Sequence, residues 1–413
     1  MKKIVTTAGL AALGVVSMQA APDVGLTPSQ TSKPWSLSAN LRGFYDDNIT
    51  TAPNAIAEDS VGIEFSPAIS LNLVKDQTYL GLGYEYKLRW FEDRDPDNSD
   101  HSHRFSLDLT HDFNENMSVD LGDEFVIAQE PEVLEPTGAS RLRSNMDAIH
   151  NRAHVNFTTQ LSRTYSLMAG YRNDLYNYDQ SGAGSFSALL DRVEHRVTAN
   201  LRSQLRSGTT GILGYQYRVV DYTSDDSLTF GNYLDPEVRN SDSHYVYAGF
   251  DHSFTPALLG SLRAGAQFTS YDNAIGVDDS TTSPYIDANL SYAYAKGSNI
   301  SVGLRHERNQ TDIAQVGRSL ILDQETTSAY ASVSHELTAK LTANFVGMYA
   351  NSSFGDSLAD TADNFWSLGF NMSYQINQYL LAETGYNFDD LDSDLGNRSF
   401  DRNRVYLGLK ASY

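Results

Sequence analysis

The sequence has no cysteine, and its acidic residues greatly outnumber its basic ones. Without cysteine, neither disulfides nor thiolate-bound metals can stabilise the chain. With 52 aspartates and glutamates against 30 lysines and arginines, the formal net charge is −22. No basic stripe suggests a nucleic-acid partner, and no glycine-rich phosphate loop leads from a strand into a helix. We therefore expect no nucleic acid and no cofactor.

Long hydrophobic runs are also scarce. One such run, residues 4–16, follows two lysines and precedes Ala20 and Ala21. That layout is typical of a secretory signal peptide, because the run is too short for a helix that crosses a bilayer. We expect a signal peptide at residues 1–20, cleaved after Ala20 or Ala21, and a periplasmic lead-in at residues 21–34.

What the chain does contain is strict alternation of apolar and polar residues. Its last segment, NRVYLGLKASY, places one apolar set on a single face: Val405, Leu407, Leu409, Ala411 and Tyr413. A period of two is that of a strand whose faces meet different environments. A half-buried strand of a soluble protein would show the same pattern, so this segment alone does not decide the fold class.

Similar segments recur from Trp35 onward, and we count eighteen, or sixteen if two imperfect ones, 117–129 and 309–322, are left out. A length of 413 residues would by default mean two or three soluble domains. The segments, however, are long enough for the roughly 9–11 residues that a tilted strand needs to cross a bilayer, whereas globular strands average about 5–6. The sequence therefore predicts an all-β fold: a transmembrane antiparallel β-barrel at residues 35–413.

Short and long links alternate between these segments. The expected turns are at residues 75–77, 114–116, 162–164, 207–209, 255–256, 296–299, 338–340 and 377–378. The expected long connections are 46–60, 92–103, 130–148, 179–190, 221–243, 272–283, 309–325, 351–363 and 389–401. In bacterial outer-membrane barrels the turns are periplasmic and the long loops are extracellular.

Alternation also assigns a charged inner face. The residues that we expect to line the lumen are Arg89, Arg104, Arg152, Arg172, Arg196, Arg202, Arg218, Arg263, Arg305, Glu85, Glu194 and Glu307. Pairs of arginine and carboxylate could simply stiffen the wall of a wet lumen. They could instead line a path for a hydrophilic solute. The sequence leaves both interpretations open.

Most acidic residues fall in the long connections, which we expect to form an acidic mouth. The strongest example is the set Asp389, Asp390, Asp392 and Asp394. A solvated surface that resists association is the simpler interpretation. The alternative is that the mouth attracts cations, or shares divalent cations with lipopolysaccharide. The segment DLDSD lacks the full spacing and the terminal glutamate of a calcium loop.

Catalytic and metal-binding motifs are not legible in the sequence. Asp251, His252 and Ser253 are neighbours, but successive residues of a strand face opposite sides and cannot form a triad. His101 and His103 can share a face, but two imidazoles do not complete a zinc site. We therefore expect no enzyme and no metal, and an outer-membrane hydrolase is the least favoured function.

The stretch LRGFYDDNIT, followed by SVGIEFSPAISLNL and YLGLGYEYKLRWF, resembles the opening of the family called Putative beta-barrel porin 2. The matching residues are Tyr45, Asp47, Asn48 and Pro67. The resemblance is specific over about the first ninety residues. It implies a multi-pass β-barrel in the outer membrane of a Gram-negative bacterium. Some relatives accompany exopolysaccharide export systems.

The final tyrosine resembles the sorting signal of outer-membrane barrels, an exposed strand edge that the barrel-assembly machinery reads. Further expected partners are membrane lipid, lipopolysaccharide, divalent cations at the loops and a periplasmic export complex. The expected function is a porin-like conduit for hydrophilic solutes or exported polysaccharide, with a modest cation preference. A non-conducting structural or surface-interaction barrel is the alternative.

Overall fold

The computed structural model describes residues 33–95, 97–128, 140, 147–231, 233–273, 279–316, 319–354 and 361–413. The signal peptide expected at residues 1–20, and most of the lead-in expected at 21–34, lie outside the described residues. The first strand begins at Trp35, where the barrel was expected to begin.

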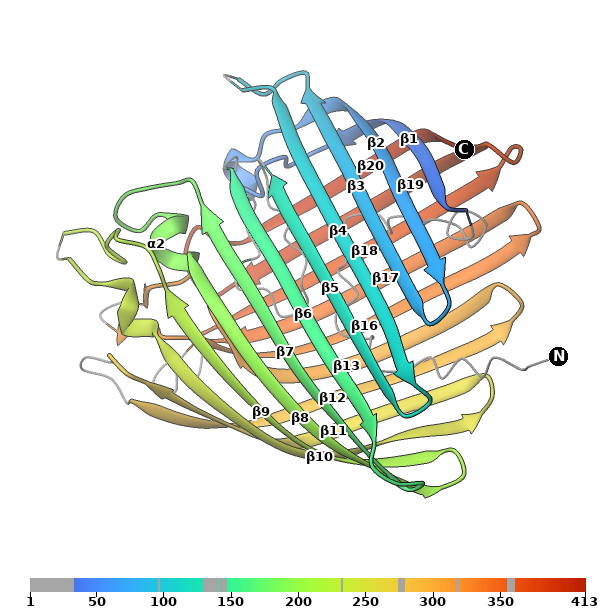
Figure 1. Cartoon of the computed structure of the whole chain (residues 1–413). Helices are drawn as coiled ribbons and strands as arrows, with labels where there is room; N and C mark the ends of the chain where they lie inside the picture. The colour runs from blue at the N-terminus through green and yellow to red at the C-terminus, as the bar shows by residue number, and fades with distance from the viewer. Residues whose placement is uncertain are drawn as a thin grey trace.

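Eighteen antiparallel strands form one sheet that closes on itself (Figure 1). The strands are β1 (Trp35–Asp46), β2 (Ser60–Lys75), β3 (Thr78–Phe91), β4 (Ser99–Asn114), β5 (Met117–Ala128), β6 (Ala148–Gln160), β7 (Tyr165–Tyr178), β8 (Arg192–Arg206), β9 (Thr209–Tyr222), β10 (Ser241–Thr255), β11 (Leu258–Tyr271), β12 (Ser280–Ala295), β13 (Ser298–Asn309), β16 (Gln324–Thr338), β17 (Leu341–Ser353), β18 (Ala362–Gln375), β19 (Leu380–Ser393) and β20 (Phe400–Ser412). Each strand pairs with the next, and β1 pairs with β20. The predicted barrel of eighteen strands is confirmed, and the alternative of sixteen is wrong.

The two faces of the wall differ as the alternation predicts. In β20, the side chains of Leu407 and Leu409 are 69% and 53% exposed, whereas Tyr406, which directly precedes Leu407, is 5% exposed. Apolar side chains that point away from a closed barrel are stable only against lipid, since exposing them to water costs about 25 cal/mol per Å². The outer face is therefore the lipid-facing one.

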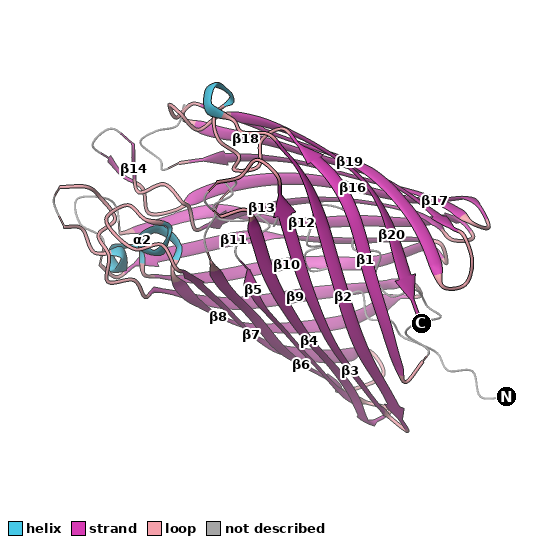
Figure 2. Cartoon of the chain, turned by 90° about the horizontal axis from the view of Figure 1, so that it is seen from above, coloured by secondary structure: helices cyan, strands magenta, loops and turns pink. Residues whose placement is uncertain are grey.

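The connections are unequal at the two ends of the barrel. Figure 2 shows tight turns at one end, and longer connections with the short helices at the other. All eight predicted turns are present as gaps between consecutive strands. The β2–β3 turn has only two residues, Asp76 and Gln77, and Asp76 takes a positive φ of 51°, as two-residue hairpins with a matching twist require.

Several long connections are shorter than predicted, because the flanking strands extend into them. β4 begins at Ser99, and β19 continues to Ser393, so the last connection is only 394–399. The imperfect segment 309–322 is not a barrel strand; it contains a short hairpin of β14 (Gln315–Val316) and β15 (Ser319–Leu320). Three short helices were not predicted: η2 (Asn54–Ile56), α2 (Phe186–Leu190) and η3 (Pro236–Arg239). Over the described ranges, no helix is long and apolar enough to cross a membrane.

Candidate functional site: the charged lumen

Every lumen residue named from the sequence lies on the inner face of the wall, opposite the exposed apolar side chains. Most of the arginines pair with carboxylates: Arg104 with Glu124 (3.4 Å), Arg152 and Arg172 with Asp174 (2.9 and 2.7 Å), Arg192 with Glu194 (2.9 Å), Arg202 and Arg263 with Asp251 (2.9 and 2.7 Å) and Arg305 with Glu307 (3.1 Å). Glu85 lies 4.0 Å from Lys87. The inner face is therefore a network of ion pairs, most of which are also charge-assisted hydrogen bonds.

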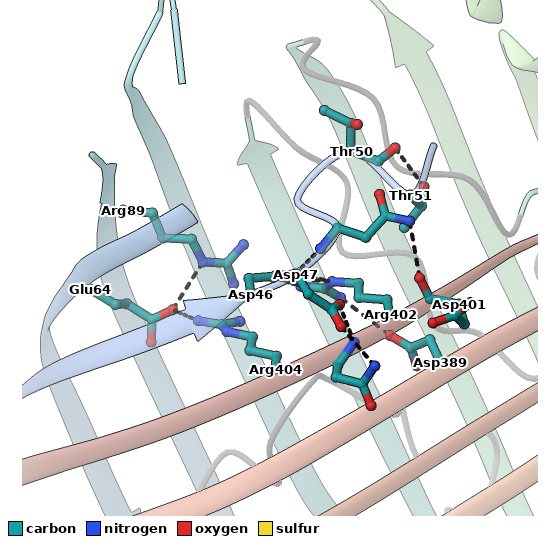
Figure 3. A network of polar contacts seen from close by, with 12 residues as sticks. Asp46, Asp47, Thr50, Thr51, Glu64, Arg89, Asp389, Asp401, Arg402 and Arg404 are labelled. Carbon is teal, nitrogen blue, oxygen red and sulfur yellow. Dashed lines mark hydrogen bonds and ion pairs between the residues drawn. The ribbon is translucent and has the colours of Figure 1, made fainter. Parts of the chain in front are cut away.

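One carboxylate joins the two ends of the barrel sequence. Glu64 of β2 is 2% exposed and accepts hydrogen bonds from Arg42 of β1 (3.0 Å), Arg89 of β3 (2.9 Å) and Arg404 of β20 (3.3 Å). In Figure 3, the guanidinium groups of Arg89 and Arg404 both point at the same carboxylate oxygen of Glu64. Arg42 also donates to Glu383 of β19 (2.5 Å). This cluster, which we call the seam cluster, ties the first three strands to the last two.

A fourth arginine, Arg402 of β20, joins the same strands next to the seam cluster, at the last residue of β1. It is 1% exposed, donates to both carboxylate oxygens of Asp46, and lies 3.2 Å from Asp389 (Figure 3). Asp389 also accepts a hydrogen bond from Ser367 (2.8 Å). The prediction that Asp389 belongs to an acidic loop is therefore wrong: it is a buried partner of Arg402 inside the barrel.

The rest of the predicted acidic set is placed as follows. Asp390 and Asp392 belong to β19, on the face opposite Asp389, because neighbouring residues of a strand alternate. Asp394 lies in the connection and accepts a hydrogen bond from the Ala362 amide (2.9 Å). Asp392 and Asp394 are exposed, so they are the two members of the set that can act as a solvated acidic mouth.

The top of β13 separates from β12 but stays paired with β16, up to Asn309 opposite Gln324. Its pairing with β12 ends at His306, three residues before the strand itself ends. There the carbonyl of Arg308 accepts hydrogen bonds from Arg218 of β9 (3.0 Å) and Gln267 of β11 (3.2 Å). The amide of Arg308 donates in return to the Gln267 side chain (3.0 Å). The chain after β13 thus starts inside the barrel rather than above it.

The described parts of the β13–β16 connection, residues 310–316 and 319–323, then pack at the mouth. Thr311 and Ile321 are buried, which is unusual for a connection that crosses a polar surface. Asp323 pairs with Arg308 (2.8 Å) and accepts a hydrogen bond from Tyr271. Burial raises the pKa of the Asp323 carboxyl above its usual value, although the Arg308 charge opposes that shift. We call residues 310–316 and 319–323 the inward connection.

Two arginines from other connections hold the inward connection in place. Arg239 of η3 is 1% exposed and donates to the carbonyls of Thr311 (3.1 Å), Ile313 and Ile321 (3.1 Å). Arg398, from the β19–β20 connection, bridges Asp312 (2.7 Å) and Asp363 (2.9 Å). Contacts from opposite sides of the barrel therefore meet on one segment.

A comparison with protein families decides the identity of this barrel. The family model described as Putative beta-barrel porin 2 matches residues 36–413. The chain belongs to this family. It is accordingly a porin-type β-barrel of the outer membrane, and the resemblance seen in the first ninety residues extends over the whole barrel.

Solved porins are similar to this porin in fold. OpdK from Pseudomonas aeruginosa aligns with a TM-score of 0.45 and 11% identity over 92% of this chain and 99% of that one. OccK2 (OpdF) from Pseudomonas aeruginosa, in complex with glucuronate, aligns with a TM-score of 0.47 and 11% identity over 92% of this chain and 98% of that one. A BenF-like porin from Pseudomonas fluorescens Pf-5 aligns with a TM-score of 0.48 and 10% identity over 92% of this chain and 99% of that one. No curated protein gives a significant match to this sequence.

The residues that could have suggested catalysis in this porin do not converge. Asp251 pairs with lumen arginines, whereas His252 bonds to Thr209 (2.8 Å) on the opposite face of β10. His101 and His103 likewise bond to tyrosines of β3 rather than to a common centre. In the part of the chain that the structure describes, no three acidic or histidine side chains are grouped as a metal site. That this porin is not an enzyme stays a prediction.

The predicted assembly signal lies at the turn end of the barrel. Val405, Leu407, Leu409, Ala411 and Tyr413 all face outward. The Tyr413 ring lies 5.5 Å from the Trp35 ring and 6.2 Å from the Tyr379 ring. Aromatic residues gather in this way at the two membrane–water interfaces of outer-membrane barrels.

Sequence reasoning missed four arginines that organise the lumen and its mouth. Arg402 lies two residues before Arg404 and so shares its face, which alternation could have shown. Arg239, Arg308 and Arg398 act in or beside connections, where no periodicity assigns a face. Their partners are known only from the tertiary structure.

Proposed function

We propose that this porin is a passive conduit for hydrophilic solutes. The observation that carries the proposal is the closed barrel of eighteen strands with a polar, charged inner face. Side chains alone fill barrels of about eight strands, while porins of about 16–18 strands leave an aqueous channel. In this proposal the inward connection narrows the channel at the mouth. It thereby sets the size of the solute that passes.

A modest preference for cations follows from the unequal charge of mouth and lumen. The exposed carboxylates of the connections, among them Asp392 and Asp394, give the outer end a negative potential that concentrates cations. The lumen arginines oppose this effect. Because the Debye length is about 8 Å at physiological ionic strength, the preference should weaken as salt is added.

Small solutes are a better match to this lumen than an exported polysaccharide. A sugar chain would need open aromatic faces for stacking. Tyr245 and Tyr285 pack against each other in the lumen (5.4 Å between ring centroids), and the Arg218 guanidinium lies 5.7 Å from the Tyr245 ring. Both tyrosines are buried, so these rings act in packing.

Planar-bilayer recording of the purified barrel tests the conduit. We expect stepwise conductance and a reversal potential that shows a mild cation preference. The double variant Asp392→Asn/Asp394→Asn should reduce that preference. Asp76→Asn is the matched control, because it removes an exposed carboxylate at the turn end of the barrel.

Three results separate the possible functions. A folded barrel that never conducts would favour the structural or surface-interaction barrel. Conductance with an unchanged reversal potential in the double variant would refute the acidic mouth but keep the conduit. An equal loss of preference in the Asp76→Asn control would show that net charge, rather than the mouth, sets the selectivity.

A further inference from the structure

Three arginines stand in one row on the inner face of β7, β8 and β9. Arg172 is directly opposite Arg196, and Arg196 is directly opposite Arg218, in the antiparallel registers of these strands. Side chains that are directly opposite have Cβ atoms only about 4.5–5.5 Å apart, and like charges at such positions destabilise a sheet. A row of three guanidinium groups therefore requires a compensating anion.

The outer two arginines of the row have partners. Arg172 donates to both oxygens of Asp174 (2.7 and 2.9 Å), and Arg218 donates to the Arg308 carbonyl (3.0 Å) and to Asn309 (3.5 Å). Arg196, at the centre, forms no ion pair with any described residue, and its Nε is buried without a hydrogen-bond acceptor. The guanidinium of arginine cannot deprotonate to avoid the repulsion.

Three carboxylates interact electrostatically with the row, those of Asp174, Glu194 and Glu307, and each is already engaged. Glu307 lies 3.1 Å from Arg305. Glu194, two residues before Arg196 on the same face, accepts from Arg192 (2.9 Å). Asp174 accepts from Arg152 as well as from Arg172. Arg196 itself is only partly buried, so a solute in the lumen can reach it. The row thus combines more positive charges than carboxylates, a hydrogen-bond donor without an acceptor and access from the lumen.

We propose that Arg196, flanked by Arg172 and Arg218, is the centre of a lumen site that binds the oxyanion of a solute, a carboxylate or a phosphate. The planar guanidinium forks match two oxygens of such a group, and charge-assisted bonds of this kind are among the strongest in proteins. Through Arg218 the row also touches the end of β13, directly before the inward connection. The proposal deepens the proposed function, since a solute that passes the mouth meets this row next.

Equilibrium binding to the purified full chain in neutral detergent tests the site without requiring conductance. The probes are inorganic phosphate and succinate, each titrated by calorimetry at constant ionic strength. Wild type should bind at least one of the two probes. Arg196→Gln should weaken that binding at least about tenfold, the loss expected for one charge-assisted contact. Arg196→Lys keeps the positive charge but not the planar guanidinium group. Its affinity for the probe should lie between those of wild type and Arg196→Gln.

Arg206→Gln is the matched control. It removes an arginine from the same strand, but at the turn end, where Arg206 is exposed and bonds to Thr209 (3.1 Å). Its affinity for the probes should equal that of wild type. Heat-modifiable gel mobility verifies that each variant is folded. If Arg196→Gln does not fold, the test is the comparison of Arg196→Lys with wild type, and Arg196→Lys should bind the probe more weakly.

The outcomes are distinct. Binding of phosphate alone or of succinate alone would support the site and identify its preferred group. No binding by wild type, or equal binding by wild type and both Arg196 variants, would overturn the proposal. A barrel that binds a probe but never conducts would refute the conduit while leaving the oxyanion site in place.

Discussion

Replacing Glu64 by glutamine tests whether the seam cluster stabilises the closed barrel. The substitution keeps the shape of the side chain and removes its charge. Three guanidinium groups, those of Arg42, Arg89 and Arg404, then surround an amide that can accept from them only as a neutral group. Arg42 keeps Glu383 as a partner, but Arg404 loses the carboxylate to which it donates.

The expected loss follows from the burial of the cluster. Removing one partner of a buried ion pair costs about 3–5 kcal/mol, because an uncompensated charge stays buried. The cluster lies on a polar, charged inner face rather than in an apolar core, so we expect the lower end, about 3 kcal/mol. That value corresponds to about two orders of magnitude in the equilibrium between folded and unfolded barrel.

Urea unfolding in lipid vesicles, followed by tryptophan fluorescence, measures the change. The three tryptophans, Trp35, Trp90 and Trp366, all face lipid, so their emission reports insertion of the wall. Glu85→Gln is the matched control: its side chain is 24% exposed and lies 4.0 Å from Lys87, so the loss should stay below about 1 kcal/mol.

A second substitution identifies the cause of the loss. In the double variant Glu64→Gln/Arg89→Met, one of the repelling charges is absent, so part of the lost stability should return. If Glu64→Gln costs no more than the Glu85 control, the cluster does not stabilise the seam. The single variant Arg89→Met gives the cost of losing Arg89 in the wild-type barrel. If the double variant has a free energy of unfolding lower than that of Glu64→Gln by this same cost, repulsion is not the reason for the loss.

Further expectations concern topology, assembly and the mouth. A protease-cleavable tag at Asp226 should be cut on intact cells and one at Lys340 protected; the reverse pattern would invert the assigned orientation. Leu407→Asp should sharply lower the fraction of heat-modifiable, folded barrel, because a carboxylate on the lipid face costs free energy at that depth; undiminished folding would show that the last strand tolerates charge. Arg239→Met should release the inward connection and raise single-channel conductance, and an unchanged conductance would mean that this connection does not narrow the path. The folded-state pKa of Asp323 is raised, so its stabilising contribution is complete below the unfolded pKa and is lost as pH rises through the folded one; acidification from pH 7 to 5 should therefore leave the inward connection in place, and an increase in conductance would contradict this.

The sequence by itself predicted the wall. Alternation is a local property with a period of two, so it identified the strands, the lipid-facing side of β20 and the lumen arginines without knowledge of the fold. It also located each tight turn, because a turn interrupts the alternation. The family resemblance at Tyr45, Asp47, Asn48 and Pro67 agreed with this interpretation, and the family match then covered residues 36–413.

Partners across the lumen could not be predicted in the same way. The bond from Arg239 to the carbonyl of Ile321 spans 82 residues of sequence, and that from Arg402 to Asp46 spans 356. Such contacts depend on barrel closure, which brings distant strands together. Asp389 shows the consequence: its acidic neighbours suggested a loop, but β19 continues past it and turns it toward Arg402.

The sequence thus determined which residues face lipid, which face the lumen and where the chain reverses, because each of these follows from the local pattern of side chains along a strand. Only the tertiary structure decided that Arg196 forms no ion pair among the described residues, while Arg172 pairs with Asp174 and Arg218 donates to the Arg308 carbonyl. It alone decided that residues 310–316 and 319–323 pack at the mouth. The physical reason is that pairing of buried charges and docking of a connection are set by closure of the whole barrel, whereas alternation is set by one strand at a time.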